Sequence, residues 1–441
     1  MFGKSIIRLQ NINQKIFRKL SNSIKLPERR QDFAKLTKDD ILVFQNLLGE
    51  NNVKTKEIDD FNFDFMHWYK GNSSCVLLPE NTQQISSILS HCYKRRIAVV
   101  PQSGNTGLVG GSIPMHDEII LSMKKFTKNF ELDSTSGILE CDSGFILEEV
   151  DNRIAKEGYM VPVDLGAKGS CLIGGVVATN AGGIRLIRYG SMHANVTGLE
   201  VGQLGVITKV FMQVVPRPLS VQSAMIGVNS FEKCQQILKL GKQMLNEIIS
   251  SFEFIDGESM KMVKENADLD CPLSISSNFF LLIETSGSNE DHDSSKMDIF
   301  LTKILESGLA EDGAIRKDGY VFKHDFSLPL KYFYELPEAI RKQLNGKAKR
   351  IISFGHIGDG NVHINVSIPE YDQQIYDLLY PFVYEWVYSK GGSISAEHGI
   401  GHVKRTFHHN LINPKIREIS SSIKKLFDPN GILSPYKMID F

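Results

Sequence analysis

Two glycine-rich stretches constrain the fold of this chain more than any other feature of its sequence. Residues 101–114 read PQSGNTGLVGGSIP and directly follow an apolar, strand-like run, and residues 169–190 read GSCLIGGVVATNAGGIRLIRYG. Successive backbone amides that no side chain blocks can form a concave anion site for a pyrophosphate. For a single stretch of this kind, tight turns and close strand crossings would be the favoured explanation. Two extended stretches favour a dinucleotide site.

Neither stretch is typical of a nicotinamide-binding unit, because no G-x-G-x-x-G stands between a strand and a helix. The apolar runs at 75–79 and 97–102 flank an amphipathic stretch at 81–95, and this strand–helix–strand order predicts a mixed or parallel sheet. The motif Pro216-Arg217-Pro218 then marks a domain boundary.

The second half of the chain has a different order of predicted strands and helices. Strand-like runs alternate with helical stretches in an antiparallel α+β order, which predicts one sheet covered by helices on one face; the runs are 251–256, 278–287, 350–356 and 361–368. We therefore predict an α+β protein with a first domain at residues 36–217 and a second at 218–441.

Composition excludes several classes of protein. Fifty Lys and Arg against fifty-one Asp and Glu give a net charge of −1, so total charge gives no reason to expect nucleic-acid binding. No apolar stretch approaches the roughly 18 residues of a membrane-spanning helix. The six cysteines lie far apart without a C-x-x-C pair, which favours buried, reduced thiols over disulfides or a thiolate zinc site.

The N-terminal residues have the composition of a targeting signal. The first 27 residues carry six basic side chains and no acidic one, with Leu9, Ile12, Ile16 and Leu20 at helical spacing. An acid-poor, basic and amphipathic start is typical of a mitochondrial transit peptide, and a basic, disordered arm is the alternative. We assign residues 1–30 to this segment and expect a location in the mitochondrial matrix.

A pair of histidines is predicted to lie on one face of a β-hairpin at 354–366, FGHIGDGNVHINV. Asp359-Gly360 is a strong signal for a two-residue turn, and with these residues in the loop His356 lies directly opposite His363, with Cβ atoms about 4.5–5.5 Å apart. Two imidazoles so placed can share a metal ion; a hydrogen-bonded histidine pair is the alternative. Asn365 falls on the same face.

The glycine-rich stretches resemble the flavin-binding loops of the vanillyl-alcohol oxidase and p-cresol methylhydroxylase (PCMH) superfamily. Within it the chain is most similar to the mitochondrial D-2-hydroxyglutarate dehydrogenases, over most of residues 38–441. The resemblance implies a two-part PCMH-type FAD-binding domain, an α+β substrate domain, and FAD-dependent oxidation of a D-2-hydroxy acid, with 2-hydroxyglutarate favoured. The alternatives are a D-lactate or glycolate dehydrogenase of the same superfamily, and a silent metal-binding relative that has lost flavin.

The resemblance also implies the cofactor contacts. In the first loop the matching residues are Pro101, Gly104, Asn105, Thr106, Gly107, Gly110, Gly111 and Ser112, and in the second they are Gly175, Ala178, Thr179, Asn180, Gly182 and Gly183. Some relatives attach flavin covalently through a histidine in the first loop. Residues 101–114 contain no histidine, so we expect non-covalent FAD.

The same resemblance assigns the chemistry. His356, His363 and Glu397 match the ligands of a divalent metal, usually zinc, and two histidines, one carboxylate and an open position are the layout of a catalytic zinc site. His398 matches the proton acceptor, while Lys323 and Asn365 match residues that hold the substrate. We expect electron-transfer flavoprotein as the electron acceptor. His402, His408 and His409 have no match and are predicted to be solvated.

Two segments of the family pattern are absent from this chain. Several tens of residues, including a G-S-E-G-T-L-G stretch that encloses flavin, are missing after Val201, where only residues 202–205 correspond to that stretch. A W-x-x-R-E helix, whose arginine binds a substrate carboxylate, has no counterpart around 315–317, and the family's N-P-Y-K reads S-P-Y-K at 434–437. A skipped exon or incomplete gene model would explain the clean edges of both gaps, and a protein that has lost activity is the alternative.

Overall fold

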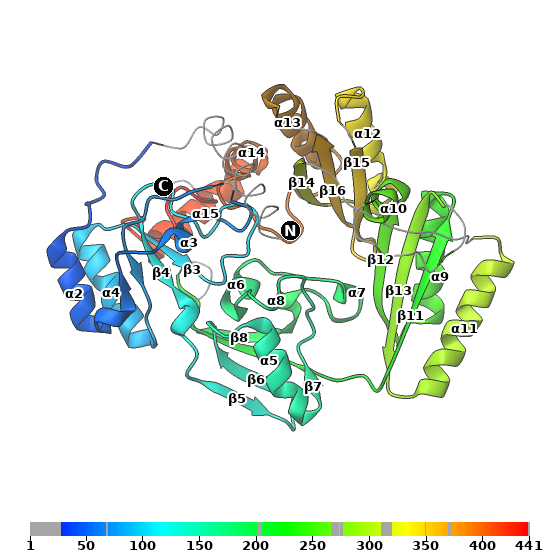
Figure 1. The fold of residues 1–441 in the computed structure, drawn as a ribbon, viewed down its shortest axis with the longest axis horizontal. Helices are drawn as coiled ribbons and strands as arrows, with labels where there is room; N and C mark the ends of the chain where they lie inside the picture. The colour runs from blue at the N-terminus through cyan, green and yellow to red at the C-terminus, as the bar shows by residue number, and fades with distance from the viewer. Residues whose placement is uncertain are drawn as a thin grey trace, which may run out of the picture.

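The structure is a computed structural model that describes residues 28–67, 69–200, 205–265, 273, 277–309, 320–348, 350–368 and 372–439. Two α+β domains lie beside each other (Figure 1). The segment predicted as a transit peptide falls largely on residues 1–27, and the two junctions where family segments are missing fall on 201–204 and 310–319. All three lie outside the described residues.

The first part of the N-terminal domain is a small mixed sheet with the order β1-β2-β4-β3. Its strands are β1 (Val53–Lys54), β2 (Val76–Leu77), β3 (Val99–Gln102) and β4 (Ile119–Ser122), and the short helical turns η1 (Glu50–Asn52), α3 (Asp59–Asn62) and η2 (Met123–Lys125) lie between them. Strands β2, β4 and β3 are parallel, as the strand–helix–strand order predicted. Helices α2 (Lys38–Leu48) and α4 (Thr82–Arg95) contribute Phe44 and Ile88 to its buried core.

The second part is an antiparallel sheet with the order β5-β6-β9-β8 and a core of its own around Leu139, Val150 and Ile173. Its strands are β5 (Phe130–Asp133), β6 (Ile138–Asp142), β8 (Val196–Glu200) and β9 (Lys209–Gln213); β7 (Tyr159–Met160) pairs separately with β10 (Val215–Pro216). The helices are α5 (Leu147–Ile154), η3 (Ala155–Glu157), α6 (Ile173–Ala178), α7 (Leu186–Tyr189) and α8 (Met192–Asn195). The predicted two-part domain is confirmed.

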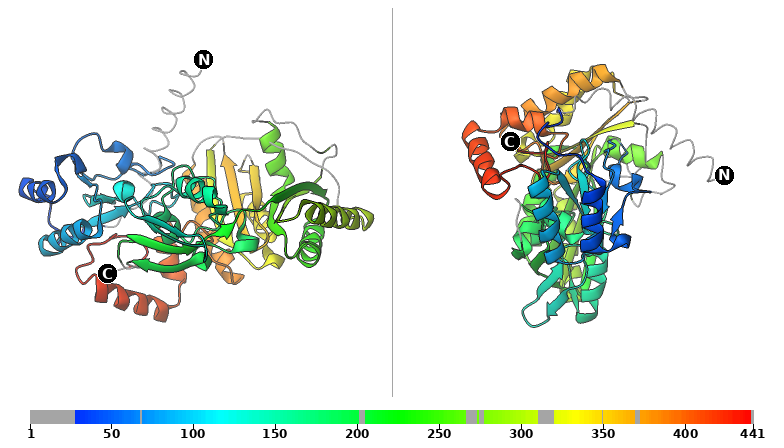
Figure 2. Two further views of the ribbon diagram at one scale, coloured as in Figure 1. Left: turned by 90° about the horizontal axis from the view of Figure 1, so that it is seen from below. Right: turned by 90° about the vertical axis from the view of Figure 1, so that its left-hand side faces the viewer.

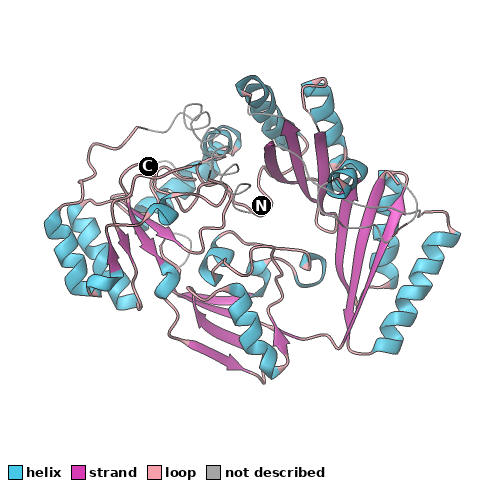
Figure 3. Cartoon of the chain, viewed as in Figure 1, coloured by secondary structure: helices cyan, strands magenta, loops and turns pink. Residues whose placement is uncertain are grey.

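The C-terminal domain is built on a six-stranded antiparallel sheet with the order β11-β13-β12-β15-β16-β14. The strands are β11 (Ser220–Val228), β12 (Ile249–Asp256), β13 (Phe279–Gly287), β14 (Tyr320–Ser327), β15 (Arg350–His356) and β16 (Asn361–Ile368). Helices lie on one side of it (Figure 3): α9 (Phe231–Met244), α10 (Gly257–Lys264), α11 (Glu290–Glu306), α12 (Glu335–Leu344) and α13 (Gln373–Ser389), with the turn η4 (Leu330–Tyr332) before α12. The prediction of one antiparallel sheet with helices on one face is confirmed.

Alternation along the strands separates an apolar face from a polar one. Phe254 on β12 and Ile364 on β16 are fully buried, in one cluster with Ile237 of α9 and Val383 of α13. On each strand, the residues that alternate with these buried ones point to the opposite face of the sheet. That opposite face meets the N-terminal domain, because α7 packs against β12.

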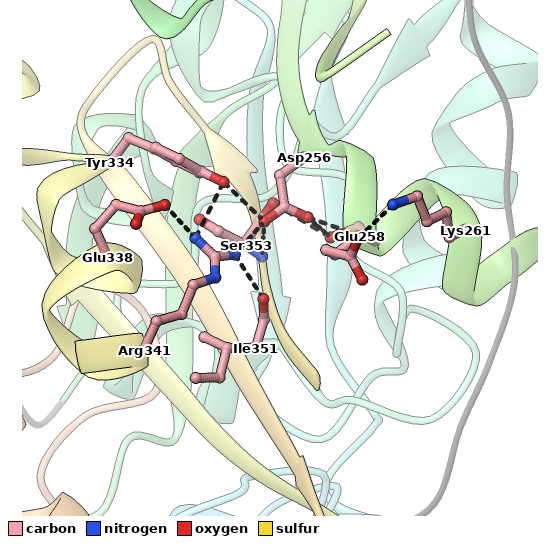
Figure 4. Close-up of polar contacts among 9 residues, drawn as sticks. Asp256, Glu258, Lys261, Tyr334, Glu338, Arg341, Ile351 and Ser353 are labelled. Atoms are coloured by element: carbon pink, nitrogen blue, oxygen red, sulfur yellow. Dashed lines mark hydrogen bonds and ion pairs between the residues drawn. The ribbon is translucent and has the colours of Figure 1, made fainter. Parts of the chain in front are cut away.

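A buried polar cluster ties the helices to the sheet on the covered side (Figure 4). Asp256 caps α10, accepting hydrogen bonds from the amide (2.8 Å) and hydroxyl (2.7 Å) of Ser259. It also accepts the Ser353 amide at 2.9 Å and lies 3.4 Å from the Arg341 guanidinium of α12. Burial raises the pKa of Asp256. We assign this cluster a structural role, since it joins α10, α12 and β15.

The end of the chain returns to the N-terminal domain (Figure 2). After α14 (Arg405–Leu411) and α15 (Pro414–Phe427), Leu433 forms a parallel bridge with Val99 of β3. Lys437 is buried, and its Nζ donates to the carbonyls of Gly110 (2.9 Å) and Ile113 (2.6 Å) in the first glycine-rich loop. The last described residues are therefore part of the first domain's core.

Candidate active site

Polar side chains from four neighbouring strands share the face of the large sheet that the helices leave free. Strand pairing places Glu253 opposite His356, Asp325 opposite His363, and Lys323 opposite Asn365. Residues two apart on a strand point to the same face. The row runs across the sheet as Lys323 and Asp325 on β14, His363 and Asn365 on β16, His356 on β15 and Glu253 on β12.

The hairpin that carries the histidines differs from the two-residue turn that the sequence predicted. The turn spans residues 357–360, and Phe354 rather than His356 pairs with His363. Asp359 explains the difference, because its side chain accepts the Asn361 amide at 3.1 Å and so closes a longer turn. The predicted register is wrong by two residues, which leaves both imidazoles on one face. Their ring centroids are 5.6 Å apart.

Three predicted metal ligands lie close together beside the β15–β16 hairpin. The ligand atoms of His356, His363 and Glu397 all lie within 4.8 Å of one another, and His356 Nε2 is 3.2 Å from Glu397 Oε1. Glu253 accepts a hydrogen bond from His356 Nδ1 at 2.7 Å, which leaves Nε2 to face the group. Two imidazoles and a carboxylate with one ring nitrogen fixed by an outer carboxylate fit a divalent cation.

Burial and charge set the ionisation of the three groups. Burial disfavours the His356 cation, but hydrogen bonds with Glu253 and Glu397 raise the pKa of His356 to about 10. Burial lowers the pKa of His363 to about 4, so this ring is neutral at physiological pH. Burial opposes the charge on Glu397, whereas the hydrogen bond from His356 lowers the pKa of Glu397. Without a cation, a protonated His356 balances the two carboxylates beside it.

His398, the predicted proton acceptor, lies beside this group. Its ring stacks on that of His363 with centroids 6.0 Å apart, and Nδ1 is 3.7 Å from Asp325 Oδ2. It lines a pocket together with Lys323, whose side chain is exposed. The other walls of the pocket are Tyr69, Leu108, Val109, Phe322, Asp325, Tyr376, Tyr380, Tyr384, Val403 and Lys404.

The two glycine-rich loops pack against each other. A Cβ atom on Gly104 would stand 2.4 Å from the Ser170 carbonyl, and one on Gly175 would stand 2.9 Å from Cβ of Ser103. Asn105 and Asn180 adopt the left-handed conformation, with φ of 57° and 51°. The Asn105 side chain is fixed because its Nδ2 donates to the Phe63 carbonyl (2.7 Å) and its Oδ1 accepts a hydrogen bond from the Ser112 hydroxyl (2.7 Å).

Both loops also touch the segment that carries Glu397 and His398. The amide of Gly183 donates to Glu397 Oε1 at 3.4 Å. On the other side, the His402 amide donates to the Val109 carbonyl at 3.0 Å, and a Cβ on Gly401 would stand 2.4 Å from that carbonyl. The structure thus brings the predicted flavin loops, the metal-ligand group and the proton acceptor together. Glycine amides from two loops beside this group fit an anionic dinucleotide.

Comparison with known proteins agrees with this arrangement. The family model described as FAD linked oxidases, C-terminal domain, matches residues 217–438, half of the chain, and the model described as FAD binding domain matches residues 73–203. This chain belongs to the FAD-linked oxidases. It is 42% identical to the mitochondrial D-2-hydroxyglutarate dehydrogenase of Arabidopsis thaliana, covering 95% of this chain and 85% of that one. It is 38% identical to the Bos taurus protein of the same name, covering 94% and 86%.

Solved structures show the same fold. A p-cresol methylhydroxylase with bound substrate superimposes with a TM-score of 0.71 at 13% identity, covering 92% of this oxidase and 98% of that chain. An alkyldihydroxyacetonephosphate synthase gives 0.71 at 13%, covering 94% and 87%. The predicted PCMH-type fold is confirmed.

The comparison with the Arabidopsis protein also bears on the missing segments. That alignment extends over 474 positions, 33 more than the 441 residues of this oxidase, so at least 33 positions of the relative lie opposite gaps. The relative therefore has residues that this chain lacks.

Three residues of the site were not predicted from the sequence, and the exposure of three histidines was predicted wrongly. Glu253, Asp325 and Lys404 were not predicted, although Asp325 follows Lys323 by two residues and had to share its face. His402 was predicted to be solvated, but it is only 7% exposed, and burial lowers its pKa to about 4. His408 and His409 are half-buried rather than solvated. His402 is buried because the loop after His398 packs against Val109 of the other domain, whereas His408 and His409 lie on α14, which packs against α13.

None of the helices within the described residues is both long and apolar enough to cross a lipid bilayer. The five cysteines among these residues are free and buried.

Proposed function

We propose that this FAD-linked oxidase oxidises a D-2-hydroxy acid, with D-2-hydroxyglutarate as substrate and 2-oxoglutarate as product. One observation carries the proposal: Glu397 and His398, adjacent in sequence, lie between the glycine-rich loops and the His356–His363 pair. A proton acceptor, a cation site and a flavin site would then meet around one substrate carbon. The names of the Arabidopsis and Bos taurus relatives support the same activity.

FAD would be held without a covalent bond by residues of the two loops, from Pro101 to Ser112 and from Gly175 to Gly183, with the non-proline backbone amides as hydrogen-bond donors. A divalent cation, for which we propose zinc, would be held by His356, His363 and Glu397. When bound, FAD supplies the acceptor for the hydride on C2, and the cation supplies positive charge that favours the ionised hydroxyl.

His398 would receive the hydroxyl proton. Its Nδ1 faces Asp325, so Nε2 is the nitrogen available to the substrate. A general base of this kind contributes roughly 10²–10⁴-fold to rate. Lys323 and Asn365, opposite each other on β14 and β16, would hold the substrate carboxylates. Together these groups would remove one proton and orient C2, and the hydride would carry two electrons to the flavin.

A second substrate class is favoured by the names of other relatives. A 36% identical protein of Schizosaccharomyces pombe is named a putative D-lactate dehydrogenase, and a 37% identical protein of Saccharomyces cerevisiae is named a D-2-hydroxyglutarate–pyruvate transhydrogenase. D-lactate and glycolate have no second carboxylate, so they would not need the exposed Lys323. A silent metal-binding relative would lack flavin absorbance altogether.

Partner and location belong to the same proposal. Electron-transfer flavoprotein is our proposed acceptor, on the family resemblance. We propose a mitochondrial location, in the matrix, because the similar D-2-hydroxyglutarate dehydrogenases are named mitochondrial and residues 1–27 are basic and free of acids.

The test compares the 441-residue chain with a variant into which both missing family segments have been inserted. Losing as little as 100 Å² of apolar surface over the flavin would weaken the binding free energy of FAD by about 2.5 kcal/mol. This corresponds to a nearly 100-fold higher dissociation constant. We therefore expect weak FAD binding and poor turnover from the chain as written, and stoichiometric FAD and D-2-hydroxyglutarate oxidation from the restored chain. Absence of flavin absorbance and of turnover from both would refute the proposal, and faster turnover of D-lactate would favour the second substrate class.

A further inference from the structure

Asp325 forms hydrogen bonds with the loop that carries two of the proposed functional residues, Glu397 and His398. This carboxylate is 1% exposed on β14, the edge strand of the large sheet. Its Oδ1 accepts the backbone amide of Glu397 at 3.0 Å, and its Oδ2 accepts the backbone amide of His398 at 3.2 Å. The Ser395 hydroxyl adds a longer contact to Oδ2 at 3.4 Å. One side chain therefore holds three points of a four-residue stretch.

These hydrogen bonds matter because the loop has no regular secondary structure. Residues 394–400 belong to no helix or strand, so their amides cannot be satisfied within a secondary-structure ladder. Asp325 supplies acceptors for two of those amides, and it stands directly opposite His363 in the β14–β16 pairing. The loop is thereby fixed to the strand pair that also carries His363.

Lys404 is the counter-ion that keeps this buried carboxylate charged. Its Nζ lies 3.3 Å from Asp325 Oδ2, and the lysine is 5% exposed. Burial opposes the charge on Asp325, and the adjacent Lys404 ammonium offsets that cost. Removing one member of such a pair leaves an uncompensated buried charge.

We propose that Asp325, with Lys404 as its counter-ion, is a positioning residue that holds Glu397 and His398 against the His356–His363 pair. This inference rests on the proposed metal site and deepens it. Acceptors of this kind, one step removed from the ligands, typically change metal affinity by 10–100-fold when they are removed.

A role for Asp325 as a ligand fits the structure less well. One of its oxygens and one ring nitrogen each of His363 and His398 also lie within 4.8 Å of one another, so the group has the right dimensions. Both oxygens, however, already accept backbone amides, and the Lys404 ammonium touches Oδ2. That positive charge would repel a cation bound to the same oxygen.

The experiment measures zinc affinity by competition with a chelator in the full chain, for wild type and for Asp325→Asn, Lys404→Met and the double variant. Asp256→Asn is the matched control, because Asp256 is equally buried, also caps backbone amides and also pairs with a cation, but on the helix-covered side. His363→Ala defines the effect of losing a ligand. Amide hydrogen exchange of residues 395–400 is followed in the zinc-free proteins.

We expect Asp325→Asn to weaken zinc binding 10–100-fold and to speed amide exchange at Glu397 and His398. The double variant should show the same loss of affinity but a higher unfolding temperature than Asp325→Asn, because no buried lysine is left unpaired. Asp256→Asn should lower the unfolding temperature and leave zinc affinity unchanged.

Wild-type zinc affinity in Asp325→Asn would overturn the inference, and so would a loss as complete as in His363→Ala, which would make Asp325 a ligand. An equal loss of affinity in Asp256→Asn would also overturn it, because general destabilisation would then explain both. Failure of the wild-type chain to bind zinc would instead refute the proposed metal site, and amide exchange would still show whether Asp325 holds the loop.

Discussion

His324 should make the C-terminal domain sensitive to acid. The ring is 3% exposed on β14, stacks on Phe326 with centroids 5.4 Å apart, and faces Tyr380 of α13 at 5.2 Å. Within the described residues, its Nε2 has no hydrogen-bond partner. Burial, with the nearby positive charge of Lys404, lowers the pKa of His324 from 6.5 to about 3. The folded protein therefore keeps this ring neutral where the unfolded chain protonates it.

The sign and size of the effect follow from proton linkage. Below pH 6.5 the unfolded chain binds one more proton than the folded chain, so stability is full above this pH and is lost as pH falls toward 3. One group with these pKa values lowers the free energy of unfolding by about 2.3 kcal/mol between pH 6.5 and pH 4.5. His324→Phe, which fits the aromatic surroundings, should remove that contribution and leave other titrating groups unchanged.

The assay is urea unfolding at the two pH values with chelator present, so that metal release adds no pH dependence. The chain has two tryptophans, Trp68 and Trp386. In a Trp68→Phe background, fluorescence reports from Trp386 on α13, the helix that covers His324. His292→Phe is the control, because this histidine of α11 is half exposed. Equal pH dependence in wild type and His324→Phe would refute the reasoning.

Three further predictions concern the site. Gly104→Ala should weaken FAD binding at least about tenfold without changing metal content, because its Cβ would stand 2.4 Å from the Ser170 carbonyl and force the loops apart; flavin titration checks this. Glu253→Gln should weaken zinc binding about 10–100-fold by releasing His356 Nδ1, and unchanged affinity in a chelator competition would contradict it. In the flavin-loaded protein, His398→Ala should retain metal and FAD but lose turnover by about 10²–10⁴-fold; near wild-type rates would mean that the proton leaves by another route.

Much of the architecture was predictable because local patterns and tertiary packing agree. Thr37 and Asp40 form a capping box at the start of α2, a pattern that can be recognised in the sequence alone, and the runs at 350–356 and 361–368 form β15 and β16 as expected. Strand β14 was not predicted. Its inward position 324 is a histidine, which interrupts the apolar side of the alternation, and only burial among aromatic rings reveals it as a core residue.

The site was only partly predictable, for a different reason. The shared face of His356 and His363 depends on a period of two and tolerates an even error in register. Their proximity to Glu397, by contrast, came from the family resemblance, since no local pattern relates residues on different elements. The Asp325–Lys404 pair joins residues 79 positions apart, and nothing in the sequence near either residue indicates the other.

The return of the C-terminus to the first domain has a consequence for biosynthesis. The bridge from Val99 to Leu433 and the hydrogen bonds from Lys437 to the first glycine-rich loop are made by residues that follow the whole second sheet in the chain. The flavin half is translated before the second domain, yet its core cannot close until residues 432–437 have been synthesised. A chain that stops after α15 would still carry every proposed metal ligand but would leave the first loop without Lys437. Stable flavin loading would therefore follow the synthesis of Lys437, and a chain that stops after α15 would be impaired in the domain that is synthesised first.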